Sequence, residues 1–431
     1  MGHLDELWYR LYCAISRCNR AILSLQEHGN DKLGEETTKQ RIAEVRFLRA
    51  NFYFKLKMVF NKVPWIDEEV YKNNTQEQTR NDALTGDELW DKIIADFEDA
   101  YNTLPEKQND GGRVNKVAAA GYLAKCYLER AWGNGYEDST GVNFINKDYM
   151  QKVVDYTDVV EKSQYGYLED YGDIFLPEYD NNKESVFAVQ ASDYNDDHTS
   201  FGRANWSNTL NGVWGIWSCG WDFQKPSQDF VNAFKTRNGL PEFDDYDATN
   251  DHPVNGQPTA QKWDPRLFHT VGMPTFPYKY DKEYTLTTAN SRTPNTYGYY
   301  TDMKCVPQRS KGETYNGSWQ AFAMNEYVIR YTESMLDRAE ALIELGRLAE
   351  ARTIINDIRR RAANSIKKHI EYAADQCEIS LYPESYFQNK EMARKCLRWE
   401  RRLEMGQEHE RFFDLRRWGM LSTTLNAYFK R

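Results

Sequence analysis

The sequence lacks long hydrophobic runs, an excess of positive charge and closely spaced cysteine pairs. No stretch of about 18 consecutive apolar residues occurs, so no segment is expected to cross a membrane as a helix. Lys and Arg number 55 against 65 Asp and Glu, and the resulting net charge of −10 argues against binding to nucleic-acid phosphates. The seven cysteines include no C-x-x-C pair and are too few for a disulfide scaffold in a chain of 431 residues.

Catalytic and cofactor motifs are also missing. The seven histidines show no H-E-x-x-H spacing, and neither a G-x-S-x-G elbow nor a Walker loop occurs. We therefore predict no catalytic residue, no cofactor and no metal site. An all-α glycoside hydrolase stays open as an alternative, because its pair of carboxylates is recognised by a separation in space that a sequence does not reveal.

Aromatic residues, by contrast, are abundant. The chain has 12 Trp, 29 Tyr and 20 Phe, which make up 14% of its residues. Disordered chains are poor in aromatic residues, so this composition predicts a folded protein. The length is sufficient for about three domains of roughly 150 residues or for one large domain.

Proline and glycine divide the chain into three parts. Ten of the 13 prolines and 12 of the 25 glycines fall between residues 166 and 320. This distribution predicts a helical N-terminal part (1–165), a loop-rich insert with little regular structure that carries the candidate ligand site (166–320), and a helical C-terminal part (321–431). The three parts are expected to form one domain overall.

Apolar residues outside the insert recur with helical spacing. Thr85 with Glu88 three residues later has the capping-box pattern at the start of a helix over 85–104. Helices joined in pairs by short links suggest tetratricopeptide-like hairpins, so we predict a mainly α fold, and a peptide-binding tetratricopeptide scaffold stays open as a function. The other predicted helices are 4–25, 37–59, 115–131, one with Tyr327, Tyr331 and Met335 on its face that ends at Gly346, 348–362, 389–404 and 408–418.

Four blocks in this order resemble the SusD/RagB family of outer-membrane glycan-binding lipoproteins. They are 43–54 with 61–64, 112–119, 329–333 with 338–341, and 400–404 with 410–411 and 414–418. The charged residues in these blocks are expected to form Arg–carboxylate pairs between neighbouring helices. Those residues are Arg46, Arg49, Arg330, Arg338, Glu340, Glu400 and Arg401.

The resemblance implies a non-catalytic protein that binds an oligosaccharide or other nutrient and delivers it to a TonB-dependent, SusC-like outer-membrane transporter. It also implies a cell-surface lipoprotein that touches the membrane only through a lipid anchor. The signal peptide, the lipidated cysteine and the family's Pro- and Asn-rich tail are missing from this sequence, which we therefore expect to be trimmed at both ends.

The densest aromatic region lies in the insert. Four tryptophans fall between residues 206 and 221 among several glycines, without helical or strand periodicity. Flat indole faces suit the C–H face of a sugar ring, and nearby amides and carboxylates can bind its hydroxyls; alternatively, the rings anchor the insert to the scaffold. The resemblance places Trp221, and near a second position Trp206, where family members contact glycan. The predicted ligand-binding residues are Trp206, Asn208, Trp214, Trp217, Trp221 and Asp222.

Three further segments of the insert carry alternatives. The run 297–300, Tyr-Gly-Tyr-Tyr, is predicted as a strand, with a second sugar platform as the alternative. The acidic loops 193–197 and 245–251 partly match a calcium-binding loop but lack its glycine and its final glutamate. We interpret both loops as solvated acidic segments.

Overall fold

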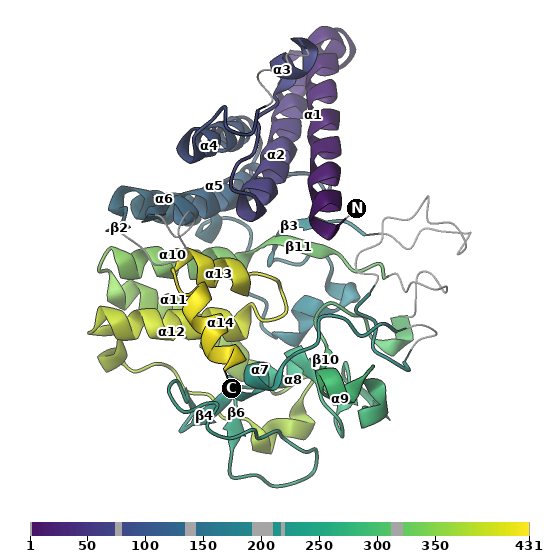
Figure 1. Ribbon diagram of the computed structural model, residues 1–431, viewed down its shortest axis with the longest axis vertical. Helices are drawn as coiled ribbons and strands as arrows, with labels where there is room; N and C mark the ends of the chain where they lie inside the picture. Colours follow the sequence, from purple (N-terminus) through teal and green to yellow (C-terminus); the bar gives the residue numbers. More distant parts are fainter. Residues whose placement is uncertain are drawn as a thin grey trace. The chain divides into compact units, whose positions relative to one another are not determined.

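The computed structural model describes residues 2–73, 80–133, 144–191, 210–216, 220–311 and 322–430 (Figure 1). Contacts between Cα atoms divide the chain into two compact units. Unit 1 comprises residues 1–163 and 412–431, and unit 2 comprises residues 164–411. The three-part division at residues 165 and 320 stays a prediction.

Unit 1 is built from helices that pack on one another along the chain. α1 packs on α2, α2 on α4, α4 on α5, and α5 on α6. A single residue, Gly34, links α1 to α2 with φ at 81°, in the left-handed region that favours glycine. The elements are α1 (His3–Leu33), α2 (Glu35–Val59), α3 (Glu68–Asn73), α4 (Gly86–Thr103), α5 (Lys116–Ala131), β1 (Trp132–Gly133), β2 (Phe144–Ile145), α6 (Lys147–Glu161), α13 (Arg411–Arg417) and α14 (Leu421–Phe429).

Local sequence signals explain these helices. The Thr85 hydroxyl accepts a hydrogen bond from the Glu88 N–H at 3.2 Å, and the Glu88 carboxylate accepts one from the Thr85 N–H at 2.8 Å. This reciprocal pair is the predicted capping box, and it begins α4. The apolar faces meet in a core whose fully buried side chains include Ile22, Phe47, Ile93, Phe97, Ala118 and Leu123.

Unit 2 combines three packed helices with small antiparallel sheets. α10 (Tyr331–Glu344), α11 (Leu348–Asn364) and α12 (Lys390–Glu404) contact one another. The strand pairs are β11 (Glu326–Arg330) with β3 (Ser185–Val189), β4 (Lys235–Arg237) with β5 (Leu240–Pro241) and β6 (Lys262–Trp263), β7 (Val271–Gly272) with β10 (Thr301–Asp302), and β8 (Pro277–Tyr278) with β9 (Asp281–Thr285).

Short helices connect these strands. They are η2 (Gly172–Phe175), η3 (Pro177–Tyr179), α7 (Gln228–Asn232), α8 (Leu267–Thr270), η4 (Thr288–Asn290), α9 (Pro294–Tyr297), η5 (Arg309–Lys311), η6 (Glu371–Gln376) and η7 (Glu384–Phe387). Helices with small sheets in a loop-rich middle confirm the predicted mainly α fold. No helix in the described ranges is long and apolar enough to cross a membrane.

Four predictions differ from the structure. The helix predicted over 4–25 continues to Leu33 as α1, and three further elements were wrong. The helix expected to include Tyr327 begins only at Tyr331, because residues 326–330 pair with β3 as a strand. The helix predicted over 408–418 shortens to α13, since Gln407 and His409 have φ values of 67° and 73° outside the helical region. The strand predicted over 297–300 is absent because Tyr297 ends α9, Gly298 turns the chain at φ 78°, and β10 starts at Thr301.

The predicted Arg–carboxylate pairs between elements are confirmed for five residues: Arg46, Arg49, Arg330, Glu400 and Arg401. The Arg49 guanidinium binds both oxygens of Asp96 at 2.7 and 2.9 Å and so joins α2 to α4. Arg401 binds Asp337 at 2.6 Å and joins α12 to α10. For Arg338 and for Glu340, an ion pair with a neighbouring helix stays a prediction. The remaining pairs are Arg46 with Glu68 and Asp99, Arg330 with Glu184, Glu404 and Glu408, and Glu400 with Arg266 and Arg359.

Candidate functional site

Two segments of the tryptophan-rich region lie side by side in unit 2. The Asp222 N–H donates to the Gly212 carbonyl at 2.9 Å, and the Phe223 N–H donates to the Leu210 carbonyl at 3.2 Å. Gly220 permits this approach, because a Cβ atom there would lie 2.3 Å from the Val213 carbonyl oxygen. The segments that carry Trp214 and Trp221 are therefore neighbours.

Val213 anchors this region to the core of unit 2. Its side chain is fully buried in a cluster that includes Tyr278, Leu286 and Met303. The next residue, Trp214, is 42% exposed, and its carbonyl accepts a hydrogen bond from the Asn290 amide at 3.1 Å. Because the valine fills the core, the adjacent indole ring stays at the surface.

Asp222 organises the surrounding loops. It is 2% exposed, and its carboxylate accepts hydrogen bonds from the Thr301 hydroxyl at 2.8 Å, from the Arg292 backbone N–H at 2.9 Å and from the Lys225 ammonium. The donors come from three separate segments of the chain. Asp222 thereby holds Arg292 beside Trp221, although 70 residues separate the two partners of the hydrogen bond.

The Arg292 guanidinium, a hydrogen-bond donor, lies over two aromatic rings. The centre of its guanidinium lies 5.5 Å from the Trp221 ring centroid and 4.9 Å from that of Phe223, which is 46% exposed. Cation–π contacts of this kind fix the orientation of a guanidinium. Among the described residues, no carboxylate pairs with this side chain, and its Nε has no hydrogen-bond partner.

Two exposed tyrosines lie on the segment that follows. Tyr297 is 60% exposed and Tyr299 is 45% exposed. The Ser291 hydroxyl donates to the Gly298 carbonyl at 2.6 Å and so ties this segment to the one that carries Arg292. These segments are linked by the hydrogen bonds given above, and we use the name aromatic cluster for six residues on them: Trp214, Trp221, Phe223, Arg292, Tyr297 and Tyr299.

The predicted site residues divide into two groups. Trp206, Asn208 and Trp217 lie outside the described residues. Trp214, Trp221 and Asp222 lie on the paired segments. No sequence pattern points to Arg292, because its place beside Trp221 depends on a contact between distant segments. Phe223 could be recognised from the sequence as an aromatic neighbour of Trp221.

A cavity of about 190 Å³ elsewhere in unit 2 is the alternative site. Two of its cations are already paired, because Lys304 and Arg330 bind the Glu408 carboxylate at 2.7 and 3.0 Å. Burial raises the pKa of Asp180, another lining residue, to about 6. The volume is below the roughly 300 Å³ at which small-molecule sites usually begin, so the cavity is small for an oligosaccharide.

The acidic loop over 245–251 is paired with cations of the protein. Asp251 lies 2.8 Å from the Lys235 ammonium, and Asp245 lies 3.0 Å from the Arg237 guanidinium. Both carboxylates are about half exposed. This geometry agrees with a solvated acidic segment; the loop over 193–197 lies outside the described residues.

A mainly helical scaffold with small sheets in a loop-rich middle is the SusD-like fold. Two family models match the chain: the SusD family over residues 183–431, and a SusD-like family described as "Starch-binding associating with outer membrane" over residues 2–128. The chain belongs to the SusD family, whose members are non-catalytic carbohydrate-binding proteins associated with the outer membrane. Membership in this family favours non-catalytic carbohydrate binding over the two alternatives, a glycoside hydrolase and a peptide-binding scaffold.

Individual relatives agree with this assignment. A SusD-like protein of Bacteroides ovatus is 29% identical over 191 residues, which cover 44% of this chain and 33% of that protein. The match therefore spans about a third of that curated relative. A solved SusD-like carbohydrate-binding protein of Bacteroides fragilis has a TM-score of 0.70 at 21% identity, with 98% of this chain and 75% of that chain covered. A structure solved with a xylogluco-oligosaccharide has a TM-score of 0.64 at 20% identity, with 99% and 74% covered.

Proposed function

We propose that this chain captures an oligosaccharide nutrient at the cell surface and delivers it, without bond cleavage, to a TonB-dependent outer-membrane transporter. The aromatic cluster is the proposed place of capture. The observation that carries the proposal is a guanidinium in cation–π contact with Trp221 and Phe223 and without a carboxylate partner among the described residues. The linked segments also carry the exposed rings of Trp214, Tyr297 and Tyr299.

The cluster offers both kinds of contact that a sugar ring needs. The exposed faces of Trp214, Phe223 and the two tyrosines can cover the apolar C–H face of a pyranose. The Arg292 N–H groups can donate hydrogen bonds to its hydroxyls. Because the two cation–π contacts already restrain the Arg292 side chain, less side-chain entropy is lost when a ligand binds.

The predicted site residues have different roles in this proposal. Trp206, Asn208, Trp214, Trp217 and Trp221 remain proposed ligand contacts. Asp222 is buried and accepts three hydrogen bonds, so we assign it the positioning of Arg292 and Lys225.

Titration calorimetry with xyloglucan-derived and starch-derived oligosaccharides, chosen after a glycan array, tests the site. Trp214→Ala and Arg292→Met should each weaken binding about tenfold, equivalent to about 1.4 kcal/mol. Because Trp214 is 42% exposed, its removal should change the free energy of unfolding by no more than about 0.5 kcal/mol. Tyr428→Ala, which removes a ring that is 41% exposed on α14, is the matched control and should bind normally.

Unchanged affinity in both variants would remove the aromatic cluster from the site. A loss of affinity together with a large drop in the melting temperature would instead assign these side chains to loop anchoring. Trp221→Ala belongs in the same series, and its sugar-dependent fluorescence quenching should disappear while its thermal transition stays nearly unchanged.

The association of the family with the outer membrane supports the proposal that the chain works beside a transporter and is attached there by a lipid. Cross-linking of the full-length protein in native outer membranes should recover a TonB-dependent transporter that mass spectrometry identifies. Recovery of the protein without any such transporter would contradict the delivery step and leave glycan binding unaffected.

A further inference from the structure

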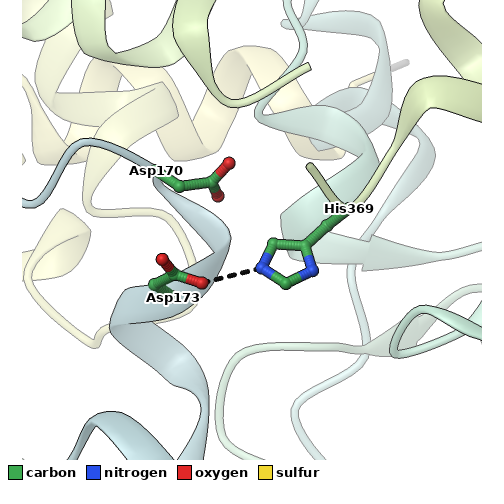
Figure 2. Close-up of side chains that lie close together, drawn as sticks. All are labelled: Asp170, Asp173 and His369. Carbon is green, nitrogen blue, oxygen red and sulfur yellow. Dashed lines mark hydrogen bonds and ion pairs between the residues drawn. The ribbon is translucent and has the colours of Figure 1, made fainter. Parts of the chain in front are cut away.

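Three side chains that are typical metal ligands converge in unit 2, apart from the aromatic cluster. They are Asp170, Asp173 and His369, and one ligand atom from each lies within 4.8 Å of the other two (Figure 2). Asp170 and Asp173 are buried, and the His369 side chain is 15% exposed. We call these residues the Asp–Asp–His cluster.

The local backbone brings the three side chains together. Gly172 lies between the two aspartates, and its N–H donates to the Asp170 carboxylate at 2.7 Å. A Cβ atom at this position would lie 2.9 Å from His369 Cδ2 and 2.8 Å from the Tyr280 hydroxyl oxygen, so glycine permits the approach of both rings. Tyr280 stacks on His369 at 4.4 Å between ring centroids and fixes the imidazole, whose Nε2 lies 2.7 Å from an Asp173 oxygen.

Asp170 provides a second, independent observation. It is 6% exposed, yet among the described residues only the Gly172 N–H donates to it, at Oδ1. Figure 2 shows its carboxylate directed toward His369, with no hydrogen bond to the other two residues of the cluster. A buried carboxylate with a single hydrogen bond is costly unless a cation compensates it.

We propose that Asp170, Asp173 and His369 bind one divalent transition-metal ion, with Zn²⁺ as the best match. Imidazole favours zinc and its neighbours over Ca²⁺ and Mg²⁺, and carboxylate oxygens complete a mixed N/O ligand set. Ligand atoms around tetrahedral zinc lie about 3.4 Å apart. The 2.7 Å contact between His369 and Asp173 must therefore lengthen, and separations of up to 4.8 Å must shorten, when the ion enters. The ion would link η2 to the segment after α11, nearly 200 residues away along the chain.

Lys368 is the competitor for this position. Its ammonium lies 2.7 and 2.6 Å from the two Asp173 oxygens and 2.8 Å from the Tyr179 hydroxyl. The side chain is 46% exposed, so it can withdraw into solvent when a metal ion enters. If the cluster is a metal site, removing this lysine should therefore strengthen metal binding.

Titration of the full chain with CoCl₂, followed by visible absorption, and with ZnCl₂, followed by calorimetry, tests the proposal. One ion should bind per chain. Asp170→Asn and His369→Gln should each weaken binding by about 10- to 100-fold, whereas Lys368→Ala should strengthen it severalfold. His252→Gln removes an exposed imidazole outside the cluster and should bind like the parent protein.

Two results would overturn the proposal. One is metal affinity that stays unchanged in both Asp170→Asn and His369→Gln, which would assign the binding to thiols or other surface groups. The other is a crystal soaked in ZnCl₂ without an anomalous peak between the three side chains. If the Asp170 variant fails to fold by circular dichroism, the Lys368→Ala titration and the anomalous peak decide the question.

Discussion

Glu404 in unit 2 is a fully buried carboxylate surrounded by guanidinium groups. It binds Arg330 at 3.0 Å and Arg266 at 3.1 Å, and it also pairs with Arg361. Burial alone would raise the pKa of Glu404, but the Arg361, Arg330 and Arg266 guanidiniums outweigh it and hold the pKa well below its usual range. The carboxylate joins β11, α11 and α12 because each of these guanidiniums needs a negative partner in the interior.

Replacing Glu404 with Gln should destabilise the protein by about 3–5 kcal/mol at neutral pH, because three buried cations lose a partner. The carboxyl has a lowered pKa in the folded state, so its contribution is present above the unfolded pKa of about 4.3 and is lost as pH falls below it. The free energy of unfolding of the parent protein should therefore fall between about pH 5 and pH 3, and more steeply than that of Glu404→Gln.

Urea unfolding followed by circular dichroism at several pH values measures this difference. Glu283→Gln, an exposed substitution in the same unit, is the control and should change stability by no more than about 0.5 kcal/mol. Parallel pH profiles for the parent protein and Glu404→Gln would show that Glu404 is not the source of the pH dependence.

At the scale of elements, two segments of the tryptophan-rich region, 210–213 and 220–223, are held by backbone contacts and one buried valine. Residues 210–213 lie against 220–223, and Val213 inserts into the core of unit 2. The exposed Trp214 ring is therefore not part of that core. The contacts that stabilise these two segments are therefore different from the side chains that they expose at the surface.

Gly220→Ala should damage the loop selectively. The added methyl group would lie 2.3 Å from the Val213 carbonyl oxygen, so the two segments must separate. We expect sugar affinity to fall about tenfold or more while the main unfolding transition changes little, as measured by calorimetric titration and by differential scanning calorimetry.

The control for this substitution is Gly166→Ala, where a methyl group would meet nothing within 4 Å. Normal affinity in Gly220→Ala would mean that the pairing of 210–213 with 220–223 is dispensable for binding.

At the scale of the whole molecule, the end of the chain completes a unit that begins at the start of the chain. Residues 412–431 belong to unit 1, and Arg417 in α13 binds Glu129 in α5 at 2.8 Å across 288 positions. Arg417 also binds Asp414 at 2.9 Å. Unit 1 is therefore discontinuous in sequence, and its completion depends on contacts between distant segments.

Arg417→Met should destabilise unit 1 by about 3–5 kcal/mol, because Glu129 is buried and would lose its guanidinium partner. Hydrogen exchange should report this loss as faster exchange in α5. The double variant Glu129→Gln with Arg417→Met should recover part of the stability, since no unpaired charge then remains at position 129.

Arg10→Met, which removes an exposed ion pair on α1, is the control and should cost no more than about 1 kcal/mol. An Arg417→Met variant as stable as this control would show that residues 412–431 do not stabilise unit 1 through Glu129.

Much of the fold could be predicted from the sequence because its determinants are local. The apolar spacing of α1, the Thr85–Glu88 capping box and the Asn389 cap of α12 depend on residues within one or two turns. The same spacing failed at Tyr327, where the pairing of β11 with β3 overrides it. Strand pairing depends on a partner about 140 residues away, which a local pattern does not contain.

The sequence by itself determined the helical scaffold, the family motifs with their Arg–carboxylate pairs, and the concentration of large rings in the insert. Only the tertiary structure decided that Val213 is the anchor and Trp214 the exposed ring, that Arg292 stacks on Trp221, and that His369 meets Asp173. The physical reason is that burial and charge pairing are fixed by neighbours in space. Those neighbours come from segments that the chain brings together only when it folds.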